Sequence, residues 1–240
     1  MTTRMTTQWI DIAARDGGTY GAYLALPPRP GPGGRNPGLV LFQEIFGVNA
    51  HIRSVAEQYA LDGFVVLAPD VFWRDAPRIE LGYEGADMER AMQLMGAADG
   101  RQLADDAATT VAALRARPEV AGKVAAMGFC MGGRLAYVAA ATAGIDAAVC
   151  YYGGGIHNQL DLAARVACPV QFHHGGDDPH TPPEAVARIE EAFVGKEAEF
   201  HLYPGANHGF NCWARGAYDA RSAALAHGRT LSFLAERLFR

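Results

Sequence analysis

The chain of 240 residues has no long apolar run, no cluster of basic residues and no paired cysteines. Since it contains no stretch of about 18 consecutive apolar residues, the sequence predicts no membrane-spanning helix. Lysines and arginines are scattered, and the formal net charge of −5 disfavours a surface that binds nucleic acid or an anionic membrane. Residues 1–9 include no apolar signal region, so we expect a cytoplasmic protein with no membrane or nucleic-acid partner.

Cysteine is scarce as well. The four cysteines are Cys130, Cys150, Cys168 and Cys212, and they form neither a Cys-x-x-Cys pair nor a metal-ligand pattern. We therefore expect reduced thiols, which excludes a disulfide framework. Internal repeats and low-complexity segments are also absent. Apolar residues make up 50% of the chain, which is enough for a sizeable core.

Short apolar runs alternate with segments of helical periodicity along most of the chain. Strands are predicted at residues 9–12, 19–26, 38–42, 64–68, 123–129, 147–152, 170–174 and 199–203, and helices at residues 51–61, 100–117, 183–193 and 217–239 and from residue 132 onward. The first two strands read as an antiparallel lead-in, and residues 27–37 as a surface loop. The other unbroken apolar runs are typical of strands buried on both faces of a parallel sheet.

This alternation predicts an α/β fold in which a mostly parallel central sheet has helices on both faces. We expect residues 1–240 to form a single domain. Residues 74–100 are less regular, although residues 84–95 have helical character. This segment is a candidate cap over a site.

The pattern around Cys130 is typical of a nucleophile elbow, with Cys in place of the usual Ser. Gly128 and Gly132 flank it where a strand would turn abruptly into a helix. The start of that helix would favour a thiolate through its unpaired amides and its dipole. The alternative is a small buried hydrophobic residue, a common place for free cysteine. The flanking glycines favour the nucleophile.

A thiol nucleophile needs a base and an orienting acid, which follow it in the order acid, then His, in sheets with this elbow. Asp177 and Asp178 follow the strand predicted at residues 170–174. His208 follows the last strand, between Gly205 and Gly209, where we expect an exposed loop. Chain order and position favour His208 as the base.

Other polar residues near strand ends leave alternatives open. His173 and His174 end an apolar run and read as core or rim residues. A metal site that combines them with His180 is a weaker alternative, because the spacing matches no standard site. Glu44 follows the strand predicted at residues 38–42, at the edge where open α/β sheets bind ligands.

Four separated motifs resemble, in order, those of the dienelactone hydrolase family. They are Gln43-Glu-Ile-Phe-Gly-Val-Asn49, Gly128-Phe-Cys-Met-Gly-Gly133, Gly175-Gly-Asp-Asp-Pro-His-Thr-Pro182 and Tyr203-Pro-Gly-Ala-Asn-His-Gly-Phe210. The resemblance covers nearly the whole chain. It implies an α/β-hydrolase fold, a Cys130–His208–Asp178 triad, and a lactone or ester as substrate. It also selects Asp178 over Asp177 and implies that Glu44 contacts the resting thiol.

The mechanism we expect is acyl transfer through a thioester. Cys130 attacks the carbonyl carbon, and the amides of Ile45 and Met131 stabilise the oxyanion. His208, held by Asp178, moves the proton and activates water. Neither a metal nor an organic cofactor is needed. The alternatives are a general carboxylesterase of small neutral esters, a non-catalytic or redox-sensing protein of the same fold, and, more weakly, a peptidase.

The chain departs from the resemblance where the family's type enzymes hold a substrate carboxylate with arginines. The position four residues after the catalytic His is Cys212, and the other arginine falls near Met88 rather than on Arg90. One cation could still come from Arg90, Arg78 or Arg74, but a paired clamp is not expected.

Aromatic residues are available for an apolar pocket instead. The candidates are Phe46, Trp73, Phe210 and Trp213. As substrate-binding residues we therefore expect Phe46, Trp73, Arg90 and Phe210. The prediction is that neutral or weakly polar lactones and esters are hydrolysed at least as well as dienelactone. We expect the protein to be a monomer or a small homo-oligomer.

Overall fold

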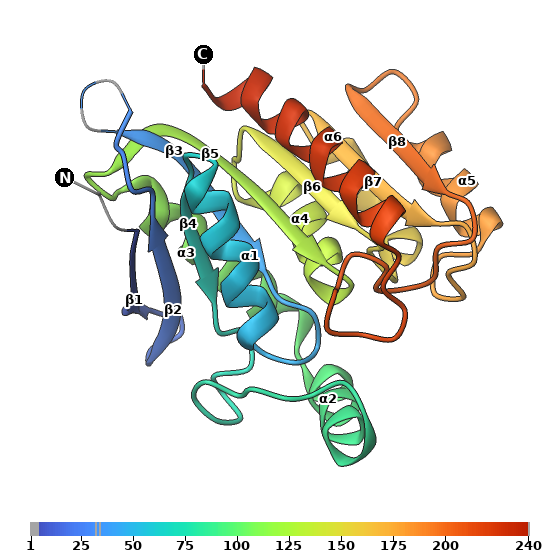
Figure 1. The fold of residues 1–240 in the computed structure, drawn as a ribbon, viewed down its shortest axis with the longest axis horizontal. Coiled ribbons are helices and arrows are strands. Elements are labelled where there is room, and N and C mark those ends of the chain that lie inside the picture. Colours follow the sequence, from blue (N-terminus) through green and yellow to red (C-terminus); the bar gives the residue numbers. More distant parts are fainter. Residues whose placement is uncertain (1–4, 32, 34, 240) are drawn as a thin grey trace.

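The computed structural model describes residues 5–239 except 32 and 34, and its centre is an eight-stranded sheet in the order β1-β2-β4-β3-β5-β6-β7-β8 (Figure 1). The strands are β1 (Thr6–Ala13), β2 (Thr19–Leu26), β3 (Asn36–Phe42), β4 (Val65–Pro69), β5 (Val120–Phe129), β6 (Ala147–Tyr151), β7 (Val170–Gly175) and β8 (Ala198–Tyr203). The helices are α1 (Ala50–Leu61), α2 (Gly85–Ala97), α3 (Gly100–Arg115), α4 (Met131–Thr142), α5 (Pro183–Ala192) and α6 (Ala220–Leu238), with short 3₁₀ helices η2 (Ile156–Asn158) and η3 (Leu160–Arg165).

Strand direction follows from the connections. β1 and β2 form an antiparallel pair, and β2 also runs antiparallel to β4. The strands from β3 to β8 are parallel to their neighbours, since helices carry the chain back between them. The carboxyl ends of these parallel strands therefore meet at one edge of the sheet, where their loops can share a site.

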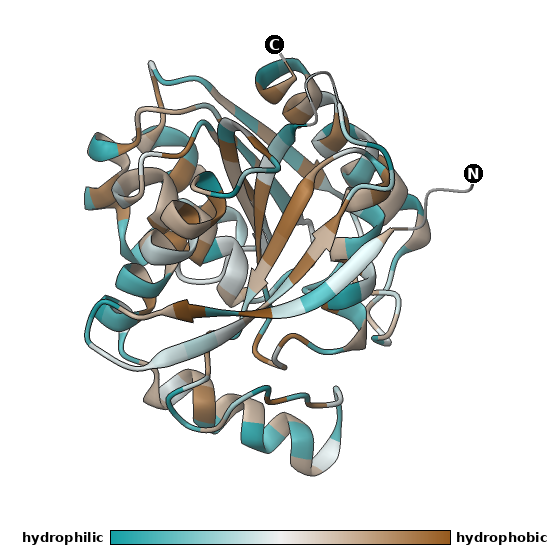
Figure 2. Cartoon of the chain, turned by 90° about the vertical axis from the view of Figure 1, so that its left-hand side faces the viewer, coloured by the Kyte–Doolittle hydropathy of each residue, from teal (hydrophilic) through white to brown (hydrophobic). Residues whose placement is uncertain are grey.

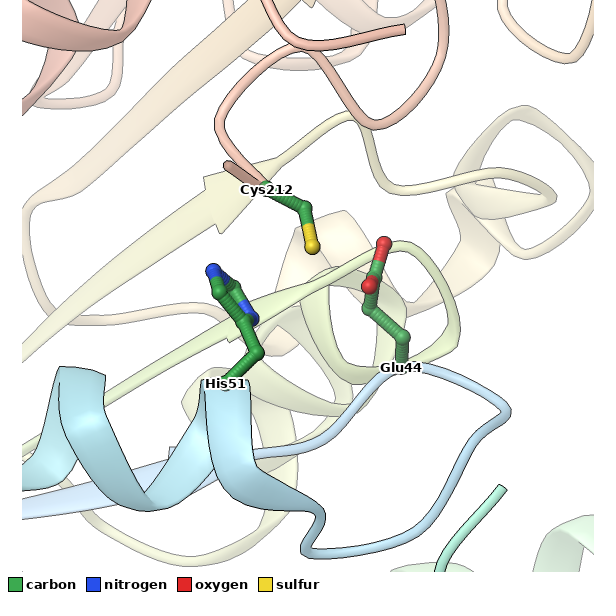
Figure 3. A group of neighbouring side chains, drawn as sticks. All are labelled: Glu44, His51 and Cys212. Carbon is green, nitrogen blue, oxygen red and sulfur yellow. The ribbon is translucent and has the colours of Figure 1, made fainter. Parts of the chain in front are cut away.

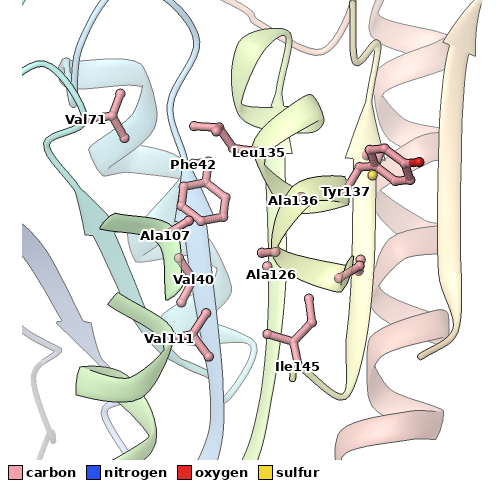
Figure 4. Close-up of a cluster of buried hydrophobic side chains, with 14 of the residues drawn as sticks. Val40, Phe42, Val71, Ala107, Val111, Ala126, Leu135, Ala136, Tyr137 and Ile145 are labelled. Carbon is pink, nitrogen blue, oxygen red and sulfur yellow. The ribbon is translucent and has the colours of Figure 1, made fainter. Parts of the chain in front are cut away.

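Two hydrophobic clusters fill the two faces of the sheet. One joins inward side chains of α1 and α6 to the strands, and the other joins α3, α4 and α5. Figure 1 shows α1 and α6 over the near face and α4 behind the sheet. The inner strands are among the most hydrophobic segments (Figure 2). Figure 4 shows the second cluster, where Val40 and Ala126 of the sheet meet Val111 and Leu135 of the helices.

The predicted α/β-hydrolase arrangement of a mostly parallel sheet with helices on both faces is confirmed. Every predicted strand and helix is present, with ends that differ by a few residues. The predicted loop at residues 27–37 is shorter, because β3 begins at Asn36. The short helices η2 and η3 were not predicted, because a helix of three to six residues is too short to show a period. No described helix is both long and apolar enough to cross a bilayer.

Candidate active site

Cys130 lies at the abrupt turn between β5 and α4. Its backbone has φ 56° and ψ −118°, a strained conformation that residues other than glycine rarely adopt. Its amide donates to the carbonyl oxygen of Tyr151 at 3.0 Å, which ties the turn to β6. The side chain is half-buried and borders a pocket. This is the geometry of a nucleophile elbow.

Gly128 and Gly132 make this turn possible because a side chain would not fit at either position. A Cβ atom at Gly128 would overlap the carbonyl group of Gly132. One at Gly132 would overlap the carbonyl oxygens of Phe42 and Gln43. The start of α4 can thus pack directly against the end of β3, which brings Cys130 toward the loop after that strand.

His208 and Asp178, from the loops after β8 and β7, are joined by a hydrogen bond. Nδ1 of His208 lies 2.8 Å from Oδ2 of Asp178. The carboxylate also accepts hydrogen bonds from the His180 amide at 2.8 Å and the Thr181 hydroxyl at 3.0 Å. Asp178 is buried, so these bonds fix it and it fixes the imidazole ring in turn.

The electrostatics of this pair favour a charged ring. Burial works to lower the pKa of His208, but the hydrogen bond to Asp178 and the nearby Cys130 sulfur outweigh it and raise the pKa from 6.5 to about 10. Burial also opposes ionisation of Asp178, yet its hydrogen bonds, first of all from His208, hold the pKa of this carboxyl below its usual value. At neutral pH the pair is therefore an imidazolium beside a carboxylate.

Glu44 is almost fully buried in the loop after β3, and its ionic partner is Arg215. Nη1 of Arg215 lies 2.9 Å from Oε1 of Glu44, with the two side chains 17% and 2% exposed. Burial raises the pKa of Glu44, and Arg215 and His208 offset part of this effect. Within the described residues the side-chain hydrogen bond of the Glu44 carboxylate comes from Arg215, and none joins Glu44 to Cys130.

A pocket of about 390 Å³ lies beside Cys130. Ile45 and Met131, whose amides the sequence predicts as oxyanion donors, both line this pocket. Met131 is the first residue of α4, so its amide has no acceptor within the helix. Much of the remaining wall is apolar. Three of its side chains come from one face of α2: Met88, Met92 and Met95.

Of the four residues expected to bind substrate, Phe46 lines the pocket and the other three do not. Trp73 lies elsewhere and donates from Nε1 to Asp106 at 2.9 Å. Arg90 has an exposed side chain on α2, away from the face that carries the methionines. Phe210 is fully buried among other aromatic rings. The prediction was therefore wrong for Trp73, Arg90 and Phe210. The sequence does not tell whether an aromatic residue near a strand end faces the cleft or the core.

The pocket is also lined by two arginines that were not predicted as site residues, Arg134 and Arg215. Arg134 lies in the first turn of α4, directly after the elbow, so its sequence position could have predicted that it lies near Cys130. Arg215 lies beyond Cys212, where the chain turns before α6. The expected arginine position, four residues after His208, is Cys212, so Arg215 was not predicted.

The three histidines of the weaker metal alternative are not brought together as ligands. His173 is buried and has hydrogen-bond partners in Tyr203 and Gln171, each at 2.8 Å. His180 lies beside His208, with ring centroids 4.6 Å apart, and lines the pocket. Among the residues that the structure describes, His173, His174 and His180 do not form a group with metal-ligand distances.

Comparison with known proteins agrees with this geometry. A family model described as the dienelactone hydrolase family matches residues 20–238. Carboxymethylenebutenolidase from Pseudomonas putida is 36% identical over 233 residues, which cover 96% of this chain and 97% of that protein. Carboxymethylenebutenolidase 1 from Cupriavidus pinatubonensis is 34% identical with the same coverage.

Solved structures agree as well. A dienelactone hydrolase-like promiscuous phosphotriesterase from metagenomic libraries has a TM-score of 0.84 and 27% identity, covering 98% of this chain and 99% of that one. The extent of these matches shows both family and fold. The chain therefore belongs to the dienelactone hydrolase family, and it is a lactone and ester hydrolase with the α/β-hydrolase fold.

Proposed function

We propose that this hydrolase cleaves carboxylic esters and lactones through a thioester on Cys130, with His208 carrying the proton and Asp178 orienting His208. The observation that carries the proposal is the 2.8 Å hydrogen bond between His208 and Asp178, made where His208 and Cys130 line the same pocket. A positioned imidazole beside a thiol is the arrangement that nucleophilic thiol catalysis requires.

In the acylation step the Cys130 thiolate attacks the substrate carbonyl carbon. A C–S bond forms, and negative charge develops on the carbonyl oxygen. When the C–O bond breaks, His208 gives its proton to the leaving oxygen. In deacylation His208 takes a proton from water, the water oxygen attacks the thioester, and the thiolate leaves with the C–S electrons. These steps need neither a metal nor an organic cofactor.

The amides of Ile45 and Met131 are the proposed donors to the developing oxyanion. Both residues line the pocket, and the Met131 amide is at the positive end of α4. A well-placed donor of this kind stabilises the transition state by about 3–4 kcal/mol.

Glu44 is the proposed control on the charge of the thiol. Its burial raises its pKa, so it can hold a proton that an exposed glutamate would lose. An ionised Glu44 would repel a thiolate at Cys130, and Arg215 offsets that repulsion. A change in the Glu44–Arg215 pair on substrate binding would therefore change how readily the thiol ionises.

The pocket wall supports a neutral or weakly polar substrate. Methionine side chains on α2 offer a flexible apolar surface that adapts to different acyl or alcohol groups. Glu44 compensates the charge of Arg215, so among the described pocket-lining residues Arg134 is the arginine left to attract an anion. We propose that residues 74–100, which include α2, act as a cap over this pocket within a single domain.

A cytoplasmic location, which would keep the Cys130 thiol reduced, is part of the same proposal. So is action as a monomer or small homo-oligomer.

The test compares kcat/KM for anionic dienelactone with that for a neutral ester of matched size, in wild type and in Cys130→Ala. We expect the neutral ester to be turned over at least as well and the variant to be inactive on both. A preference for the anionic lactone of more than about 100-fold, close to 3 kcal/mol, would contradict the substrate class. Turnover by Cys130→Ala would contradict the assignment of Cys130 as the nucleophile.

A further inference from the structure

Glu44, His51 and Cys212 come from three separate segments, and their side chains point toward one another (Figure 3). Glu44 follows β3, His51 lies in the first turn of α1, and Cys212 lies in the loop after β8. One donor atom of each residue lies within 4.8 Å of the other two, and all three residues are buried. A carboxylate, an imidazole and a thiol thus share one enclosed space.

His51 supplies an independent observation. Both of its ring nitrogens are buried without a hydrogen-bond partner among the described residues, and the residue is only 4% exposed. A buried polar group in this state is unfavourable unless something else satisfies it. Its neighbours include the ring of Trp213, with centroids 4.3 Å apart in an edge-to-face arrangement, and no hydrogen bond joins these two rings. A lone pair of this ring is therefore available to a ligand.

We propose that Glu44, His51 and Cys212 bind a divalent metal ion of the zinc class. Sulfur, nitrogen and oxygen donors together suit Zn²⁺, which takes three protein ligands and one open position in many sites. Nitrogen and sulfur ligands of tetrahedral Zn²⁺ lie about 3.5 Å apart, so small side-chain rotations close the present spacing. Binding forms a metal–sulfur bond and releases the thiol proton of Cys212 to solvent. The thiolate and carboxylate charges then balance the ion.

The surroundings accommodate this ion. A carboxylate has two oxygens, so Oε1 of Glu44 can keep its hydrogen bond from Arg215 while the other oxygen binds the metal. The Cys212 sulfur lies 3.4 Å from the Tyr83 hydroxyl, a contact that orients the ligand from outside. His51 and Tyr83 also line a surface pocket of about 280 Å³, which gives a way in.

This site is distinct from the substrate pocket, since none of its three ligands lines the cavity beside Cys130. It goes beyond the proposed hydrolysis, which needs no metal. It touches that chemistry only through Glu44, which the ion would hold in place.

The test is titration of the full chain carrying Cys130→Ser with Co²⁺, a spectroscopic substitute for Zn²⁺, followed by absorption. Serine at position 130 removes the catalytic thiol, which could itself bind a metal. We expect saturable binding of one Co²⁺ with a thiolate-to-cobalt charge-transfer band that Zn²⁺ abolishes by displacement. In the same background Cys212→Ser should remove the band, and His51→Phe should weaken binding by at least about 100-fold. Cys168→Ser, at a thiol elsewhere, should leave the band unchanged.

Because the Cys212 variant could fold poorly, the second readout is thermal unfolding. At the same concentration, Zn²⁺ should raise the Tm of Cys130→Ser much more than the Tm of the variant that also carries His51→Phe. A band that is absent from Cys130→Ser, or that survives Cys212→Ser, would overturn the proposal. Since neither readout uses turnover, a failure here is separate from a failure of the hydrolytic mechanism.

Discussion

Nη1 of Arg215 lies 2.9 Å from Oε1 of Glu44, so a largely buried ion pair joins the loop after β8 to the loop after β3 at the edge of the pocket beside Cys130. The pair neutralises a pocket arginine and gives the buried carboxylate a counter-charge. Its two members lie 171 residues apart in the sequence, and the parallel sheet brings their loops together. We expect both substrate preference and local stability to depend on this pair.

Arg215→Gln should lower the free energy of unfolding by about 2–3 kcal/mol near neutral pH, because it leaves a buried carboxylate without its cation. The loss should shrink as the pH falls, since the raised pKa of Glu44 lets the carboxyl take up a proton and lose its charge. Urea unfolding across pH measures both effects.

The matched control for that substitution is Arg90→Gln. Arg90 is exposed on α2 and its ion pair with Asp75 spans 3.7 Å, so its loss should cost less than about 0.5 kcal/mol. Equal effects of the two substitutions at every pH would show that the Arg215 pair has no special role.

Asp178→Asn should reduce kcat by about 10³–10⁴-fold while the protein stays folded. The substitution removes the carboxylate that favours the imidazolium and selects the tautomer of His208. The pKa of His208, read from the pH dependence of kcat/KM, should fall from its raised value. The neighbouring Asp177, which is exposed, provides the control. If Asp177→Asn were the more damaging change, the acid would have been assigned to the wrong residue.

Glu44→Gln should change how thiol reactivity depends on pH. A neutral amide no longer repels a thiolate, so alkylation of Cys130 by iodoacetamide should extend to lower pH than in wild type. The amide oxygen can still accept the hydrogen bond from Arg215, which should keep the fold intact. Alkylation and kcat/KM profiles that both match the wild type would leave Glu44 without a role in ionisation.

Met92→Glu should lower kcat/KM for an apolar ester by about 10-fold, because it places a charge in the apolar wall that α2 contributes. Stability should change little, since the Met92 side chain is 49% exposed. Gln93→Glu is the control, at an exposed position of the same helix that does not line the pocket. Identical kinetics for the two variants would argue against α2 as part of the substrate pocket.

The fold and the turn around Cys130 could be predicted from sequence because their signals are local. Gly128 and Gly132 have backbone contacts that exclude any side chain, so the chain shows the elbow as a pattern around Cys130. Asp178 and His208 follow β7 and β8, and the strands from β5 to β8 are neighbours in the sheet in the same order as in the chain. Neither inference needs knowledge of which loops touch.

The rest depends on contacts between loops, which sequence spacing does not encode. Arg215 was not predicted because only the position four residues after His208, which is Cys212, was considered for an arginine. Trp73 and Phe210 were expected in the pocket, yet an aromatic ring packs equally well in a core. Cys212 is not part of any metal-ligand motif in the sequence. Its proximity to Glu44 and His51 results from the fold and could not be predicted from sequence spacing.

The most direct measurement of the central proposal is peptide mass spectrometry of the enzyme quenched in acid during turnover of a slow ester. The acyl group should be found on the peptide that contains Cys130, and His208→Gln, which impairs deacylation, should not move it elsewhere. Cys150→Ala and Cys168→Ala should still show the adduct at Cys130. An acyl group on a different residue, or turnover of the ester by Cys130→Ala at a rate near the wild type, would contradict the thioester mechanism.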